Sequence, residues 1–175
     1  MADYDVIFDA GVMGEYANTV IEIPKGSMHK IEYDRQKKVM ILDRVEPGIF
    51  IKPVNYGFIP QTTDEDGDPL DTLVITDEPL PSGVALKVRI IAVMNFVDGG
   101  ENDHKIICVP QDDRHSGGSI NSLADLSDQW KAQIEYHFNH YKDLKKPGTT
   151  VVEGWFDAAQ AWATIEDCCQ RYKQA

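Results

Sequence analysis

The sequence lacks features that whole classes of protein require. Its longest unbroken apolar run, Ile90 to Met94, has five residues, which is far too short for a helix that spans a membrane. It carries 17 Lys and Arg residues against 29 Asp and Glu residues, for a formal net charge of −12. Nucleic acids and anionic membranes attract proteins through a positive field, so this balance argues against both as partners.

Cysteine and N-terminal basic residues are also scarce. The three cysteines, Cys108, Cys168 and Cys169, are odd in number and form no Cys-x-x-Cys pair, so the sequence predicts neither a disulfide framework nor a zinc motif. The first basic residue is Lys25, whereas a secretory signal peptide begins with basic residues followed by an apolar stretch. We therefore expect a cytoplasmic protein with reduced thiols.

The length and composition are those of one ordinary globular domain. The chain has 175 residues, of which 42% are hydrophobic and 26% are charged, so a packed core is expected rather than disorder. We expect a single domain over residues 1–175, and we assign no role to the N-terminal segment 1–16.

Short β-branched and apolar runs, separated by Gly and Pro, dominate the first two-thirds of the chain. This pattern is typical of a β-barrel or a β-sandwich. The strands are expected at residues 19–23, 30–33, 39–42, 72–76, 85–97 and 106–109, with a last strand at 149–155.

Two helices are predicted in the C-terminal half. Apolar residues from Leu123 to Tyr141 recur every three or four positions, and either Ser122 or Ser127 is the N-terminal cap. This stripe by itself favours a core position for Tyr141. A second helix is expected to begin after Asp157, a capping residue. The predicted fold class is α+β, mainly β.

Residues 64–71 contain five carboxylates in eight positions. Two interpretations are open: a solvated acidic loop, or a shaped turn that binds a hard divalent cation such as Mg²⁺. Gly67 and Pro69 favour the second interpretation because they restrict the backbone between the carboxylates. An EF-hand loop that starts at Asp64 is excluded, since Pro69 stands at its glycine position and Ile75 at its final glutamate position.

A second acidic segment, residues 98–103, follows the longest predicted strand. Taken alone, this segment favours a plain hairpin loop, but two acidic turns at one mouth of a small barrel could together bind more than one metal. Basic side chains alternate with acidic ones nearby, Lys105 with Asp103 and Lys30 with Glu32. Each of these lysines alone is most often an ordinary surface charge. Cations beside metal-binding carboxylates, however, could together bind a polyanionic ligand, as enzymes of phosphoryl transfer do.

These segments, taken in order, resemble the family I soluble inorganic pyrophosphatases of bacteria. Asp66-Gly-Asp-Pro-Leu-Asp71 is similar to the Asp-x-Asp-Pro-x-Asp signature of that family. The resemblance covers roughly residues 17–173 and implies a small closed, OB-like five-stranded β-barrel with two helices packed on it. The other segments that resemble the family are residues 20–24, 30–32, 43–44, 53–57, 98–105, 140–144 and 152–155.

The resemblance implies hydrolysis of pyrophosphate to two orthophosphates by a water that Mg²⁺ activates. Mn²⁺ and Zn²⁺ are possible substitutes, and a homo-oligomer is expected, with a homohexamer favoured. The catalytic residues would be Asp68 as general base, Tyr56 and Arg44, and Glu32 would support the metal ligands. The metals would be bound by Glu22, Asp66, Asp71, Asp98 and Asp103. The substrate would be bound by Lys30, Arg44, Tyr56, Lys105, Tyr141 and Lys142.

One residue departs from the family pattern. Where the family commonly has a tyrosine that contacts phosphate, this chain has Lys52, which is longer and carries a full charge. Our hypothesis is that Lys52 retains a phosphate contact and that the enzyme is active.

Three other interpretations stay open. The chain could hydrolyse another small phosphoanhydride, such as a nucleotide or tripolyphosphate. It could be an OB-like module that binds single-stranded nucleic acid, although the acidic charge argues against one. It could also be an inactive homologue, although every carboxylate that the family needs is present.

Overall fold

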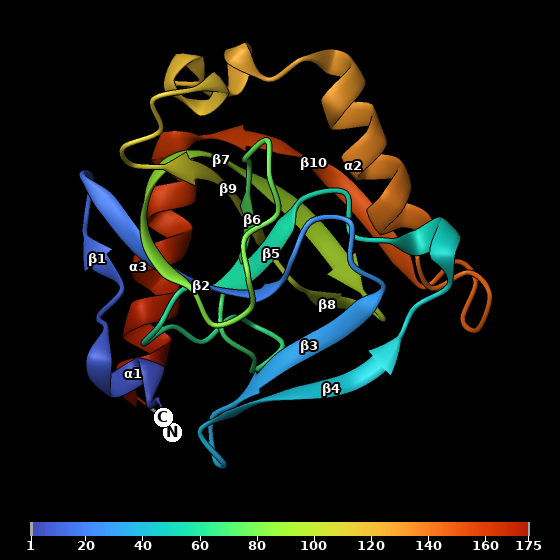
Figure 1. Cartoon of the computed structure of the whole chain (residues 1–175), viewed down its shortest axis with the longest axis horizontal. Helices are drawn as coiled ribbons and strands as arrows, with labels where there is room; N and C mark the ends of the chain where they lie inside the picture. Colours follow the sequence, from blue (N-terminus) through green and yellow to red (C-terminus); the bar gives the residue numbers. More distant parts are fainter. Residues whose placement is uncertain (1, 175) are drawn as a thin grey trace.

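Five strands form a closed ring at the centre of the fold, which Figure 1 shows with the helices around it. The computed structural model describes residues 2–174. All neighbours in the ring are antiparallel except β6 and β9, which are parallel. The predicted OB-like, five-stranded architecture is confirmed. The ring consists, in spatial order, of β2 (Tyr16–Ile23), β5 (Asn55–Phe58), β6 (Asp71–Val74), β9 (Lys105–Pro110) and β7 (Ala85–Asp98).

Three further strands extend this sheet, and two others stand apart from it. β1 (Gly11–Val12) pairs with β2, whereas β8 (Glu101–Asn102) and β10 (Thr150–Asp157) pair with β7. β3 (His29–Asp34) and β4 (Val39–Val45) pair only with each other, as a separate two-stranded sheet. This hairpin runs alongside the barrel in Figure 1.

Within the described residues, three α-helices complete the fold: α1 (Tyr4–Ile7), α2 (Asp128–His140) and α3 (Ala158–Gln174). Ser127 is the cap of α2, because its side chain accepts a hydrogen bond from the Trp130 backbone at 3.1 Å. The alternative cap, Ser122, belongs instead to the short 3₁₀ turn η3 (Leu123–Asp125), so the predicted apolar stripe begins before the helix does. None of the described helices is long and apolar enough to cross a membrane. Two more 3₁₀ turns are η1 (Gly48–Phe50) and η2 (Ser116–Ser119).

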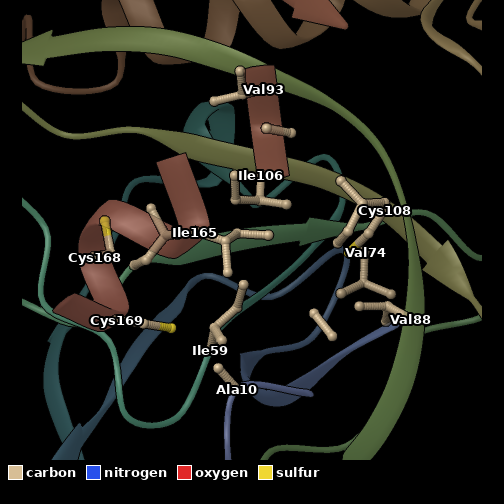
Figure 2. Packing of buried hydrophobic residues seen from close by; sticks show 14 of the residues in the cluster. Ala10, Ile59, Val74, Val88, Val93, Ile106, Cys108, Ile165, Cys168 and Cys169 are labelled. Carbon is tan, nitrogen blue, oxygen red and sulfur yellow. The ribbon is translucent and has the colours of Figure 1, made fainter. Parts of the chain in front are cut away.

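The core has two main parts, on opposite faces of β7 and β9. Ile106 and Cys108 of β9 pack with α3, whereas Ile107 and Val109 pack with α2. This alternation follows from the two-residue period of a strand. Figure 2 shows Ile165 and Cys169 of α3 pointing toward the strand residues. The two helices therefore fix the sheet from both sides.

The sequence did not predict every element. β5 was missed because it has only four residues, one of which is Gly57. A β-carbon at Gly57 would lie 2.2 Å from the Val20 carbonyl oxygen, so close strand pairing, rather than turn formation, requires this glycine. Residues 1–16 had no assigned role, yet those described from residue 2 onward include α1 and β1.

Candidate active site

A polar cavity of about 320 Å³ lies between the barrel and the β3–β4 hairpin. Its walls contain every residue predicted for the site except Lys105, which is buried beside it. The charged and tyrosine side chains near the cavity that were predicted to act are Glu22, Lys30, Glu32, Arg44, Tyr56, Asp66, Asp68, Asp71, Asp98, Asp103, Tyr141 and Lys142.

The acidic segment 64–71 is a shaped turn and not an extended solvated loop. The Asp68 N–H donates to the Asp66 carboxylate at 3.0 Å, and the Asp64 N–H donates to the Asp68 carbonyl at 2.7 Å. Gly67 has φ of +91°, a left-handed conformation that favours glycine. Asp71 then begins β6 and faces the cavity. The turn therefore presents three carboxylates to one space.

Lys105 neutralises the deepest carboxylates. Its side chain is 1% exposed, and its ammonium donates to Asp71 at 2.5 Å and also to Asp103. Burial alone would lower the pKa of Lys105, but the charges of Asp71 and Asp103 outweigh burial and raise it. The Tyr56 hydroxyl donates to the same Asp71 carboxylate. Asp71 is thus held by two donors.

Burial makes several cavity carboxylates hard to ionise. It raises the pKa of Glu22 to about 8, with Asp71 as the second cause, and that of Asp66 to about 6. The pKa of Asp71 is raised to about 7 by burial, although Lys105 opposes the shift. The pKa of Asp68 is raised by burial and by Glu32. A cation among these groups would favour their ionised forms.

The hairpin supplies cations to the opposite wall. Lys30 and Arg44 are cross-strand neighbours in β3 and β4, so their side chains lie close together. Lys30 pairs with Glu32, and Arg44 pairs with Glu46 at 2.6 Å and with Asp43 at 2.8 Å. Strand pairing therefore brings together the two substrate-binding residues predicted for this wall.

Tyr141 combines the two roles that its sequence position left open. Its ring packs against Phe138 in the core, and its hydroxyl donates to Asp98 at 3.2 Å at the cavity wall. Lys142 also donates to Asp98. The end of α2 thus contributes both residues predicted there.

Lys52, which was not in the predicted set of site residues, also lines the cavity. It is 7% exposed, and its ammonium lies 4.7 Å from the centre of the Tyr56 ring and 5.1 Å from that of Tyr141. Within residues 2–174, no carboxylate pairs with it, in contrast to the other cavity cations. Burial and the neighbouring Lys105 lower the pKa of Lys52 to about 8. Its sequence position indicated a phosphate contact, but not this aromatic surrounding.

A second feature that the sequence did not reveal is a contact that holds the start of the acidic turn. Asp64 is 2% exposed and accepts hydrogen bonds from the His104 backbone at 2.7 Å and from the His104 ring. The contact joins residues 40 positions apart, so no local pattern could have indicated it.

The donor set fits a divalent cation. As they stand, no three Asp, Glu, His or Cys side chains in the described part of the chain converge to enclose an ion. However, Asp71 and Asp103 already share one cationic nitrogen, that of Lys105. Every candidate ligand facing the cavity is a carboxylate, the chemistry that hard divalent cations prefer.

A small barrel with carboxylates and cations gathered around one polar cavity is typical of metal-dependent enzymes that act on phosphoryl groups. Comparison with known proteins identifies the family. The family model described as inorganic pyrophosphatase matches residues 19–173. An inorganic pyrophosphatase of Neisseria meningitidis is 58% identical over 100% of both chains, and one of Haemophilus influenzae is 54% identical over 99% of both.

Solved structures agree with this result. A crystal structure of an inorganic pyrophosphatase from Neisseria gonorrhoeae has a TM-score of 0.96 and 54% identity, covering 98% of this chain and 99% of that one. The enzyme from Thermus thermophilus has a TM-score of 0.88 and 38% identity, with 95% and 97% covered. The chain belongs to the inorganic pyrophosphatase family, a family that depends on divalent metals.

The buried imidazole of His137 should make the stability of the protein depend on pH. Its ring stacks on Tyr141 with 5.7 Å between ring centres, and its Nε2 atom is buried without a hydrogen-bond partner among the described residues. Burial, and then the charge of Lys52, lower the pKa of His137 to about 3. The folded protein therefore keeps this imidazole neutral in mild acid.

Replacing His137 with Gln should reduce the loss of stability on acidification. Below an unfolded pKa of about 6.5, unfolded histidine binds a proton that the folded form rejects, which favours unfolding. Between pH 7 and pH 5 the wild type should lose about 2 kcal/mol more of its free energy of unfolding than His137→Gln. Urea unfolding at one protein concentration measures this, and equal losses in both proteins would contradict it.

Proposed function

We propose that this chain hydrolyses inorganic pyrophosphate to two orthophosphates with Mg²⁺. The observation that carries the proposal is the cavity, where seven carboxylates and four cations face one another in a member of the inorganic pyrophosphatase family. Pyrophosphate is small and highly charged, and a space of about 320 Å³ lined by both signs of charge suits such a substrate.

The metal would be held by Asp66, Asp71 and Asp103, with Glu22 and Asp98 as further ligands and Glu32 in support. When bound, the cation lowers the pKa of a water and neutralises phosphate charge. All-oxygen ligation favours Mg²⁺ or Mn²⁺ over softer metals, although Zn²⁺ is a possible substitute.

Asp68 would act as the general base. No hydrogen bond from the described residues reaches its carboxylate oxygens, which leaves them free to accept a proton from the attacking water. Its raised pKa, caused by burial, strengthens it as a base. As the water oxygen bonds to one phosphorus, the bond from that phosphorus to the bridging oxygen breaks. Tyr56 would hydrogen-bond near the water, from its position beside Asp71.

The cations would bind phosphate oxygens and stabilise the charge that grows on the leaving phosphate. Lys30 and Arg44 do so from the hairpin, and Tyr141 and Lys142 from the end of α2. Lys105 belongs to the same set, and in this structure its ammonium neutralises Asp71 and Asp103.

Replacing Asp68 with Asn should lower the kcat for pyrophosphate at least about 100-fold, because amide nitrogen and oxygen cannot take the proton. Phosphate release by the wild type should also require Mg²⁺ and stop in excess chelator. Asp112→Asn, which removes an exposed carboxylate at 74% exposure, is the matched control and should retain wild-type rates. Release from ATP or tripolyphosphate that exceeds release from pyrophosphate would contradict the proposed substrate.

Lys52 should strengthen binding of both substrate and product phosphate. No carboxylate of residues 2–174 pairs with its ammonium, so this ammonium can contact phosphate without giving up a charged partner. Its removal in Lys52→Met should therefore raise the KM for pyrophosphate about tenfold, the worth of one charge-assisted contact. Inhibition by orthophosphate should weaken by a similar factor. Lys52→Tyr, which restores the residue common in the family, tests the same contact. Unchanged KM and unchanged phosphate inhibition in both variants would show that Lys52 makes no such contact.

We also propose a cytoplasmic homo-oligomer made of one domain per chain, with a homohexamer favoured by the family resemblance. The three cysteines are free and buried, which suits a reducing compartment. An open groove between η1 and α2 exposes apolar side chains, with Ile49 at 76% and Tyr136 at 68% exposure. A second copy of the chain would cover this surface.

Ile49→Asp should therefore shift the protein to smaller assemblies, because a charge in an apolar contact is costly to bury. Sedimentation velocity of wild type and variant measures this. Leu144→Asp, at a position of 66% exposure outside the groove, is the control. A monomeric wild type would contradict the proposed oligomer, and an unchanged Ile49→Asp assembly would place the interface elsewhere.

A further inference from the structure

The β3–β4 hairpin, which forms one wall of the cavity, has few attachments to the barrel. It shares no strand pairing with the ring. Its main link is Tyr33, whose N–H donates to the Glu22 carboxylate at 2.7 Å. The Tyr33 ring also stacks on Phe58 of β5, with 5.5 Å between ring centres and 4° between planes. The placement of Lys30 and Arg44 therefore depends on what holds this hairpin in position.

The N-terminal segment, residues 2–12, covers this link from outside. The Tyr4 ring packs edge-on against Tyr33, with 4.9 Å between centres, and the Tyr4 N–H donates to the Tyr33 hydroxyl at 3.3 Å. Asp3 pairs with Lys38 in the hairpin turn at 2.7 Å. In Figure 1, α1 lies near the end of the hairpin that carries this turn.

Asp5 joins, through its carboxylate, the two segments that lead to opposite walls of the cavity. It is 7% exposed, and its Oδ1 accepts hydrogen bonds from Arg35, which follows β3, at 3.0 Å and from the Gln61 N–H at 2.8 Å. The Arg35 Nε atom lies 2.9 Å from the other oxygen, Oδ2. Gln61 also donates through its side chain to the Asp5 carbonyl at 2.7 Å. Gln61 precedes the acidic turn, so one buried carboxylate joins the hairpin to the segment that leads into the turn.

The backbone conformation of Gln61 indicates that its contacts with Asp5 constrain this segment. Its φ is +54°, a left-handed conformation that is uncommon for a residue other than glycine. Such a conformation persists where surrounding contacts determine it, and the two hydrogen bonds with Asp5 are such contacts.

We propose that Asp5 is a positioning residue that sets the distance between the hairpin cations and the acidic turn. This inference rests on the proposed pyrophosphatase function for its catalytic consequence, but not for its structural one. Asp5 touches no cavity atom itself, and acts through Arg35 on one side and Gln61 on the other. Without its carboxylate, the hairpin keeps the Tyr33 link, the Asp3–Lys38 pair and the contact of Arg35 with the Tyr172 ring, but it loses its tie to the segment before the acidic turn. Lys30 and Arg44 would then be held less firmly.

Hydrogen exchange tests the structural part without reference to activity. In Asp5→Ala, amides of residues 29–45 should exchange about tenfold faster than in wild type, while those of β7 and β9 stay unchanged. Asp5→Asn keeps an acceptor for Gln61 but removes the charge, and guards against a variant that fails to fold. Asp112→Ala, which also removes a carboxylate paired with an arginine, is the control. Unchanged exchange in residues 29–45 in both Asp5 variants would overturn the proposal.

Kinetics test the positioning part. Asp5→Ala should raise the KM for pyrophosphate about fivefold and lower kcat by a smaller factor, because the hairpin cations bind the substrate before the reaction, whereas the general base Asp68 stays in place. In a Lys30→Gln background the same substitution should change KM less, since part of its effect acts through Lys30. Faster hairpin exchange with an unchanged KM would overturn the positioning role. A wild type that releases no phosphate with any divalent metal would instead refute the proposed function, and the exchange result would still decide the structural link.

Discussion

The buried contact of the Lys105 ammonium with Asp71 and Asp103 is the interaction on which the rest of the cavity depends. In a chain of net charge −12, seven carboxylates line one small space, and burial already raises the pKa of several of them. A buried charge that loses its partner costs several kcal/mol, about 3–5 in measured cases. The carboxylates remain together because the Lys105 ammonium lies among the deepest of them, Asp71 and Asp103, which are two of the proposed metal ligands.

Strand register explains why these charges meet. In the parallel pair of β6 and β9, Asp71 lies directly opposite Lys105, and in the hairpin Lys30 lies opposite Arg44. Residues directly opposite each other on neighbouring strands, parallel or antiparallel, place their side chains on the same face of the sheet, so backbone pairing determines which charges come together. The ring is a closed sheet with a helix on each side, whereas the hairpin is held by side-chain contacts. The wall formed by the ring is therefore held by strand pairing and helix packing. The position of the hairpin wall depends on side-chain contacts, among them those of Tyr33 and Asp5.

The parts predicted from sequence are those that local chemistry controls. The acidic turn is recognisable because Gly67 and Pro69 restrict it, and the helices because their apolar residues repeat at helical spacing. The unpredicted parts depend on distant contacts. β5 is short and contains Gly57, Asp64 meets His104 only in the folded chain, and Asp5 reaches Gln61 across 56 positions. The family resemblance, and not periodicity, indicated which charged residues share one site, and the geometry brings those residues together without testing their roles.

Lys52 differs from the other cavity cations because it would not have to give up a carboxylate partner in residues 2–174 in order to bind an anion. Lys30, Arg44 and Lys142 each hold a carboxylate, so each must exchange a charged partner in order to contact phosphate. Exchange of one charge-assisted contact for another yields little net free energy. Lys52 instead lies among aromatic rings, which stabilise an ammonium less than a carboxylate does, and burial already disfavours its charge. An anion in the cavity would relieve that penalty, so Lys52 is the cavity cation that would gain most from binding one.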